Sequence, residues 1–184
     1  MTPYEFLPYD VSFPKLFEKE EKRLRSILGD QPVIEHFGSS AVPGLGGKGF
    51  IDIYIAVPKE DLKAVSEKLQ TGTGYEYKKD AGVEGERLFH KINIPDETGR
   101  ERTYHTHVTY LGNQNFRECI ALRDYLRAHP DEAQRYADVK IIAAEEANEE
   151  SDGRLAKEKY LEVKGEIIRE MIQKALEEFP NAGR

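Results

Sequence analysis

The sequence predicts an α+β fold, and two observations indicate it. First, the elements are grouped: one helix comes first, then mostly antiparallel strands around one crossover helix, then three helices. Strands followed by helices, rather than strict alternation, are typical of α+β proteins. Second, the character of the chain changes after Gly112, where short alternating segments give way to long helical patterns. We expect one domain over residues 1–184, with a sheet portion at about 31–111 and a helical portion at about 115–179.

Each predicted element has its own signal. The first helix carries apolar residues at helical spacing and stops at Gly29, and the strand over residues 50–57 is apolar at every odd position from Ile51 to Val57. Residues 1–12 are predicted to be an extended arm lying on the body, and residues 180–184 a frayed tail. The predicted helices cover residues 13–28, 59–69, 115–128, 131–148 and 153–179, and the strands cover 33–37, 50–57, 75–78, 87–94 and 102–110.

Composition argues against several classes of function, although it allows a small basic pocket on an acidic surface. The net charge of −7 disfavours broad nucleic-acid or anionic-membrane binding, because both need a basic surface. One cysteine, Cys119, rules out an internal disulfide and suits a reducing compartment. No segment resembles a signal peptide, and none approaches the roughly 20 apolar residues of a membrane span. We therefore expect a cytoplasmic protein without membrane or nucleic-acid partners, whose long last helix packs on the body or on a second copy in a homodimer.

A glycine-rich loop is the most informative segment. It runs from Gly38-Ser39 to Gly49, contains five glycines, and carries Lys48 as its one basic residue. Glycine allows backbone N–H groups to approach a ligand closely, and such loops bind phosphate. On the next strand, Asp52 lies on the face opposite the apolar residues. This pattern predicts a nucleotide-handling site, although a glycine-rich turn beside a half-buried strand would look the same.

Histidines near this acid suggest a metal site. His105 and His107 are two apart on a predicted strand, so their side chains share a face, and Asp52 is the obvious third ligand. The alternative is two surface or hydrogen-bonded histidines. His36 could contribute to the site or be a packed core residue.

Basic residues elsewhere could complete a phosphate site. Lys48, Arg87 and Arg123 offer donors to phosphate, but all three could be ordinary surface or structural charges. The pairs Tyr136/Lys140 and Tyr160/Lys164 are four apart on helices, which places each tyrosine and lysine on one face. These lysines either form a basic wall for a polyphosphate or simply extend from an amphipathic face.

Three segments together resemble the GrpB family. They are His36-Phe-Gly-Ser-Ser-Ala-Val-Pro-Gly-Leu with the following Lys48 and Ile51-Asp52-Ile53, then His105-Thr-His-Val, and then Leu122-Arg-Asp-Tyr-Leu-Arg-Ala-His-Pro. The resemblance implies a nucleotidyltransferase-like fold, a small mixed β-sheet flanked by helices. It also implies that Gly38, Ser39 and Ser40 form the turn that positions a nucleotide triphosphate. Fusion of some family members to dephospho-CoA kinase hints at a coenzyme A-type ligand.

The resemblance also implies a metal, with one departure. Related enzymes hold two Mg²⁺ ions with two acids spaced Asp-x-Asp and a third acid on a later strand. Here Asp52 matches the first acid, Tyr54 stands at the second, and His105 and His107 stand near the third. Because Mg²⁺ prefers oxygen ligands and imidazole suits softer ions, the site either uses one softer metal or binds a nucleotide without transferring it. The cofactor that we expect is a divalent metal, Mg²⁺ or Mn²⁺ or alternatively Zn²⁺.

Three hypotheses follow. The first is a divergent, metal-dependent nucleotidyltransferase that moves a nucleotidyl group from a nucleoside triphosphate to an acceptor. In it Asp52, His105 and His107 hold the metal, while Gly38, Ser39, Ser40, Lys48, Arg87, Arg123, Lys140 and Lys164 hold the nucleotide. The second is a non-catalytic module that binds a nucleotide, a coenzyme A-type ligand or another phosphorylated small molecule. The third is a single-metal phosphohydrolase.

Overall fold

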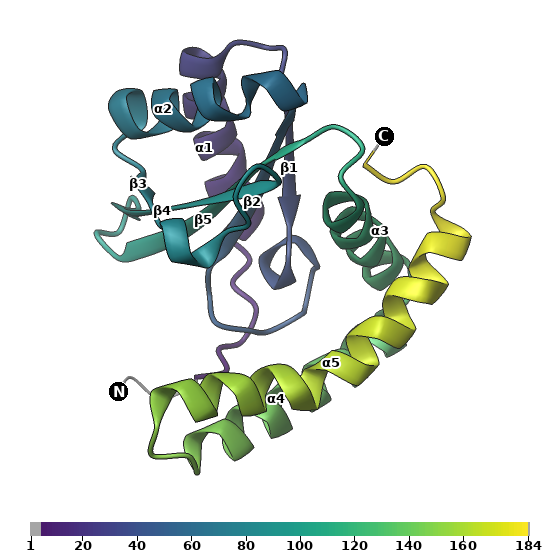
Figure 1. The fold of residues 1–184 in the computed structure, drawn as a ribbon. Helices are drawn as coiled ribbons and strands as arrows, with labels where there is room; N and C mark the ends of the chain where they lie inside the picture. The colour runs from purple at the N-terminus through teal and green to yellow at the C-terminus, as the bar shows by residue number, and fades with distance from the viewer. Residues whose placement is uncertain (1–4, 184) are drawn as a thin grey trace.

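The computed structural model describes residues 5–183 and consists of one mixed sheet with helices on both faces (Figure 1). The five strands lie in the order β1-β2-β5-β4-β3. β2 and β5 run parallel, whereas every other neighbouring pair is antiparallel. The strands are β1 (Val33–Phe37), β2 (Ile51–Val57), β3 (Glu76–Tyr77), β4 (Arg87–Pro95) and β5 (Glu101–Tyr110). The helices are α1 (Phe13–Leu28), α2 (Leu62–Thr73), α3 (Gln114–Ala128), α4 (Pro130–Asn148) and α5 (Gly153–Glu178).

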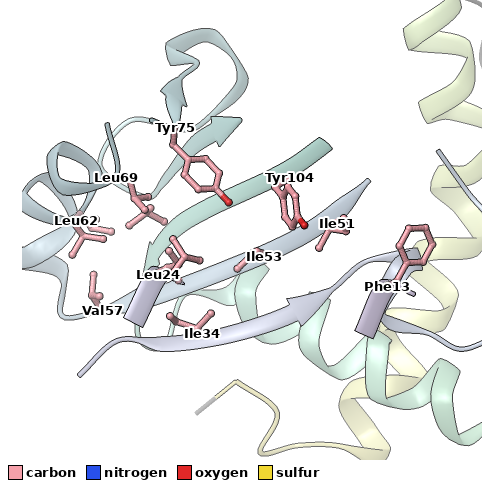
Figure 2. Packing of buried hydrophobic residues seen from close by; sticks show 13 residues of the cluster. Phe13, Leu24, Ile34, Ile51, Ile53, Val57, Leu62, Leu69, Tyr75 and Tyr104 are labelled. Carbon is pink, nitrogen blue, oxygen red and sulfur yellow. The ribbon is translucent and has the colours of Figure 1, made fainter. Parts of the chain in front are cut away.

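One face of the sheet is closed by α1 and α2. The odd residues of β2 from Ile51 to Val57 are buried there against Leu24 of α1 and Leu69 of α2, as Figure 2 shows. Alternation along an extended strand forces the even residues to the opposite face. Asp52 and Tyr54 therefore point away from this core, toward the side where the C-terminal helices lie.

The C-terminal helices cover the second face. Phe116 and Ile120 of α3 pack on Tyr54 and Ala56 of β2. α4 and α5 form an antiparallel pair that lies beside the sheet (Figure 1) and packs against Val42 of the glycine-rich loop. A short connection joins α4 to α5. Asp152 caps the N-terminus of α5, because its carboxylate accepts hydrogen bonds from the backbone N–H groups of Arg154 and Leu155.

The predicted elements are observed, with shifted boundaries. α2 begins after a short 3-10 turn at Lys59–Asp61 and continues to Thr73, beyond the predicted end at residue 69. Thr71 and Thr73 do not end the helix, because Gly74, with φ of +80°, is the residue that does. The hydroxyls of Thr71 and Thr73 instead bond to carbonyls one turn earlier.

The described part of the N-terminal arm lies on the glycine-rich loop. Leu7 and Gly47 exchange two backbone hydrogen bonds of 2.7 and 2.9 Å. Residues 1–4 of the predicted arm and residue 184 of the predicted tail lie outside the described residues. Within residues 5–183, no helix is long and apolar enough to cross a membrane.

Candidate functional site

A cavity of about 350 Å³ lies between the second face of the sheet, the glycine-rich loop and the helices α3, α4 and α5. This volume is in the range of about 300–1,000 Å³ found for small-molecule sites. Much of its wall is apolar, including Leu45, Phe50, Leu122 and Ile168. The predicted site residues that line it are Gly38, Ser39, Lys48, Asp52, Arg123, Lys140 and Lys164.

The turn after β1 and the acid on β2 are in close contact. Gly38 has φ of +70°, and a Cβ built on it would lie 2.4 Å from Oδ2 of Asp52. The loop makes a second close approach at Gly47, where a Cβ would lie 2.4 Å from Oγ of Ser39 and 2.9 Å from Nζ of Lys140. A side chain at either position would displace a polar group at the cavity wall, and at Gly38 the positive φ disfavours it further.

His105 of β5 stands directly opposite Asp52 in the parallel register. Its Nδ1 lies 3.5 Å from Oδ1 of Asp52, and its ring packs against Phe50 and Phe89. The two side chains are 18% and 23% exposed, so both are reachable from solvent. Asp52 therefore reaches the cavity with a histidine beside it.

Three lysines from three different elements reach the same cavity. Nζ of Lys48 and Nζ of Lys164 lie 4.3 and 5.0 Å from the centre of the Tyr160 ring. Nζ of Lys140 donates to the carbonyl oxygen of Gly46 and lies 5.3 Å from the centre of the Tyr136 ring. Aromatic faces attract cations, so these rings hold the ammonium groups in place.

The three lysines are close enough for their charges to influence one another's pKa. Burial, followed by the positive charge of Lys164, lowers the pKa of Lys48 to about 8 and that of Lys140 to about 8. Burial also lowers the pKa of Lys164. The Asp52 carboxylate opposes the shift in all three. Near neutral pH the cavity therefore presents three ammonium groups to one carboxylate.

Arg123 lines the cavity, but its guanidinium is already engaged. It donates to Oε2 of Glu35 at 2.5 Å, to Oδ1 of Asp124 at 2.8 Å, and to the carbonyl oxygen of His36 at 2.8 Å. Two neighbouring carboxylates balance its charge, which favours the structural interpretation of this residue. Arg87 is not part of the wall, and it donates to Oδ1 of Asn115 at 3.2 Å.

The remaining predicted residues lie away from the cavity surface. His107 is enclosed by the rings of Phe37, Tyr54 and Phe89, and burial, followed by the charge of Arg87, lowers its pKa to about 3. His36 faces the α1 side of the sheet, where it stacks on Phe17 and its Nε2 lies 3.0 Å from Oγ of Ser40. Ser40 is thus a buried partner of His36 and not a cavity residue.

The three predicted metal ligands do not come together as one group. Among residues 5–183, no group of three or more His, Cys, Asp and Glu side chains is arranged to hold one, so Asp52, His105 and His107 do not form the expected three-ligand site. The physical reason is that the aromatic cluster encloses His107, while Asp52 and His105 alone face each other. Tyr54 does not replace the second acid, since its hydroxyl donates to Oδ1 of Asn115 at 2.7 Å. This arrangement gives no support to the single-metal phosphohydrolase.

Sequence reasoning missed part of the site. Asn115 lines the cavity and accepts hydrogen bonds from both Tyr54 and Arg87. The apolar wall was missed as well, because leucine and isoleucine on amphipathic helices give no signal that separates a ligand site from ordinary core.

The fold of the chain is similar to the nucleotidyltransferase fold. A structure of the Cid1 poly(U) polymerase with MgGTP bound matches 73% of this chain and 43% of its own chain, with a TM-score of 0.51 and 14% identity. At that identity the likeness shows the fold alone.

The family is more specific: the chain belongs to the GrpB family, whose model, described as GrpB protein, matches residues 3–174. A Pseudomonas aeruginosa member, UPF0157 protein PA4798, is 33% identical over 94% of this chain and 67% of its own length. The crystal structure of conserved protein GrpB from Enterococcus faecalis matches 96% of this chain and all of its own, with a TM-score of 0.76 and 26% identity. The chain spans only 38% of the length of a Bacillus subtilis relative, UPF0157 protein YqkA.

Proposed function

We propose that this protein binds a nucleotide or a related phosphorylated small molecule, such as a coenzyme A-type ligand, in the cavity between the sheet and α4–α5. The observation that carries the proposal is the convergence of Lys48, Lys140 and Lys164 on one cavity of about 350 Å³ in a protein of net charge −7. Buried ammonium groups that repel each other are costly unless an anion compensates them. The phosphates of a bound ligand would supply that compensation.

The apolar wall supports a ligand with a large non-polar part. Leu45, Leu122 and Ile168 offer no hydrogen bonds, and Phe50 adds an aromatic ring to the same wall. Small-molecule sites combine such walls with a few placed polar groups. In this arrangement Ser39 and the lysines orient the phosphates, and the rest of the ligand occupies the apolar side.

Calorimetric titration tests the binding. Purified protein is titrated with ATP, CTP, UTP and coenzyme A in EDTA, and Lys140→Met and Lys164→Met are titrated in parallel. We expect micromolar to millimolar affinity for at least one ligand, and about a tenfold loss in each variant, because removing one buried ionic contact costs on the order of 1.4 kcal/mol.

A matched control uses Lys63, which is 90% exposed on α2 and lies on the other side of the sheet. Lys63→Met removes the same charge from the protein without touching the cavity. If Lys63→Met weakened binding as much as Lys164→Met does, the effect would come from overall charge and the proposed site would be wrong.

Nucleotidyl transfer is the second candidate, favoured by the placement of Asp52 beside the Gly38-Ser39 turn and 3.5 Å from His105. In this reaction an acceptor hydroxyl oxygen bonds to the α-phosphorus, and its proton passes to the Asp52 carboxylate. The bond from the α-phosphorus to the bridging oxygen breaks, so pyrophosphate leaves, and the lysines stabilise its charge.

Incubation with α-³²P-labelled ATP, CTP and UTP, together with a lysate of small-molecule acceptors, separates the candidates. Transfer of the label would support the nucleotidyltransferase if Asp52→Asn abolishes it and Asp61→Asn, a control at an exposed acid, retains it. Saturable binding with no transfer under any condition would support the binding module alone.

A further inference from the structure

We infer that the cavity takes its phosphorylated ligand without a divalent metal, with Lys48, Lys140 and Lys164 in the place that metal ions occupy in nucleotide enzymes. The inference rests on the proposed function and narrows its ligand to the metal-free form of a polyphosphate. It follows from three features of the cavity: the charges on its wall, the residues at the expected metal positions, and the way the lysines are held.

The charges on the wall suit a bare anion. Among the described lining residues, Asp52 is the only acid, whereas Lys48, Lys140 and Lys164 line the same cavity. The fourth cation, Arg123, is balanced by Glu35 and Asp124 and adds little. A Mg²⁺ ion bound to a polyphosphate cancels part of its charge and occupies oxygens that the lysines would otherwise contact. A cavity with this excess of positive charge therefore favours the free anion.

Two of the positions expected to hold a metal ion are occupied by side chains that bind Mg²⁺ poorly. Mg²⁺ bound to a nucleotide is coordinated octahedrally by the phosphates, by water and by one or two carboxylates, of which Asp52 could supply one. Here the residue two after Asp52 is Tyr54, which is fully buried and donates its proton to Asn115. Burial raises the pKa of Tyr54 well above its usual value, so the oxygen stays neutral. On β5 the neighbour of Asp52 is His105, a nitrogen ligand that Mg²⁺ does not prefer.

The lysines are already held in position. Lys140 is buried and bonded to the Gly46 carbonyl, and Lys48 and Lys164 share the ring of Tyr160. Ammonium groups placed before the ligand arrives lose little conformational entropy on binding, which is a requirement for replacing a metal. They come from the loop, α4 and α5, so they can surround a phosphate chain from several directions.

The direction in which Asp52→Asn changes the ligand affinity distinguishes direct binding from metal-mediated binding. In a metal-mediated site Asp52 would attract the phosphates through the ion, and Asp52→Asn would weaken binding. In a lysine-held site the carboxylate repels the phosphates, and Asp52→Asn should strengthen binding. The asparagine side chain is nearly the same size as aspartate, so contact with Gly38 is preserved.

The experiment is a calorimetric titration with ATP and with inorganic pyrophosphate, in EDTA and in excess MgCl₂, with NaCl added to match ionic strength. For the unsubstituted protein we expect an affinity about tenfold higher in EDTA than in MgCl₂, a difference of about 1.4 kcal/mol, because Mg²⁺ cancels part of the charge of the anion. For Asp52→Asn we expect tighter binding in EDTA. Lys164→Met should lower affinity in EDTA and shrink the difference between the two buffers.

Equal or higher affinity in MgCl₂, or weaker binding by Asp52→Asn in EDTA, would overturn the inference while leaving the proposed function intact. Absence of binding to ATP, pyrophosphate, CTP, UTP and coenzyme A in both buffers would overturn the proposed function as well. Urea unfolding of each variant shows whether a change in affinity reflects the cavity or the fold.

Discussion

The carboxylate of Asp52 lies against the backbone of Gly38, so closely that a Cβ on Gly38 would be 2.4 Å from Oδ2. The glycine-rich loop and the acidic strand are therefore one unit, and the position of the acid depends on the missing side chain of the glycine. Replacement of either residue should disturb the other.

Gly38→Ala should destabilise the protein and move Asp52. The backbone has φ of +70°, which costs an alanine on the order of 1–2 kcal/mol, and the clash with Asp52 adds to it. We expect a loss of about 2–4 kcal/mol in urea unfolding, together with altered ligand affinity. Gly44→Ala is the control, because Gly44 has φ of +80° and nothing within 4 Å of its Cβ position. Equal losses in the two variants would show that the contact with Asp52 has no effect.

Tyr160 should act as a positioning residue for Lys48 and Lys164. Tyr160→Leu removes the ring that both ammonium groups contact, whereas Tyr160→Phe keeps it. A cation–π contact is worth about 0.5–2 kcal/mol. We therefore expect roughly tenfold weaker ATP binding by Tyr160→Leu, and an ATP affinity for Tyr160→Phe close to that of the unsubstituted protein. Titration of the two variants side by side checks this. If phenylalanine lost as much affinity as leucine, the hydroxyl and not the ring would be responsible.

Ligand affinity should fall as pH rises through about 8. Burial and repulsion by Lys164 lower the pKa of Lys48 and Lys140 to about 8, so both are mostly protonated below that pH and neutral above it. An anion therefore binds best below pH 8, and its affinity declines from pH 7 to pH 9. The other charged groups that act on these lysines are Lys157, which also lowers the pKa of Lys48, and Asp52, which raises both values.

Lys164→Met sharpens this prediction. Removing a positive neighbour raises the pKa of Lys48 and Lys140, so the midpoint of the affinity decline should move to higher pH. Titrations from pH 6.5 to 9.5 measure the midpoint in both proteins. An unchanged midpoint would mean that the three lysines do not titrate as a group.

Arg123→Leu should affect stability more than binding. It leaves the Glu35 carboxylate and the His36 carbonyl without their partner at the edge of β1. Breaking a buried pair costs about 3–5 kcal/mol, and because the Glu35 side chain is 34% exposed we expect about 2–3 kcal/mol in urea unfolding. The double variant Arg123→Leu/Glu35→Leu should recover part of the loss. A large loss of ATP affinity at unchanged stability would instead assign the guanidinium to the ligand.

The segments that the sequence predicted best are those with strong periodicity. The strand with Asp52 and the helices with Lys140 and Lys164 could be placed because side-chain direction follows from position along a strand or helix. The sequence could not decide whether Lys140 and Lys164 point into one cavity or simply extend from amphipathic helices. Periodicity shows which face of an element a residue lies on, but not which other element packs against that face. Asn115 was missed for the same reason.

The sequence by itself determined the fold class, the two faces of β2, and the presence of an acid beside a glycine-rich turn. These depend on local geometry, which the order of residues specifies directly. Only the tertiary structure decided which polar residues meet. His105 and His107 share a strand face, yet the register places His105 against Asp52 and the rings of Phe37, Tyr54 and Phe89 enclose His107. The two predicted histidine ligands therefore have different surroundings, and lysines from the loop, α4 and α5 line the same cavity as the acid.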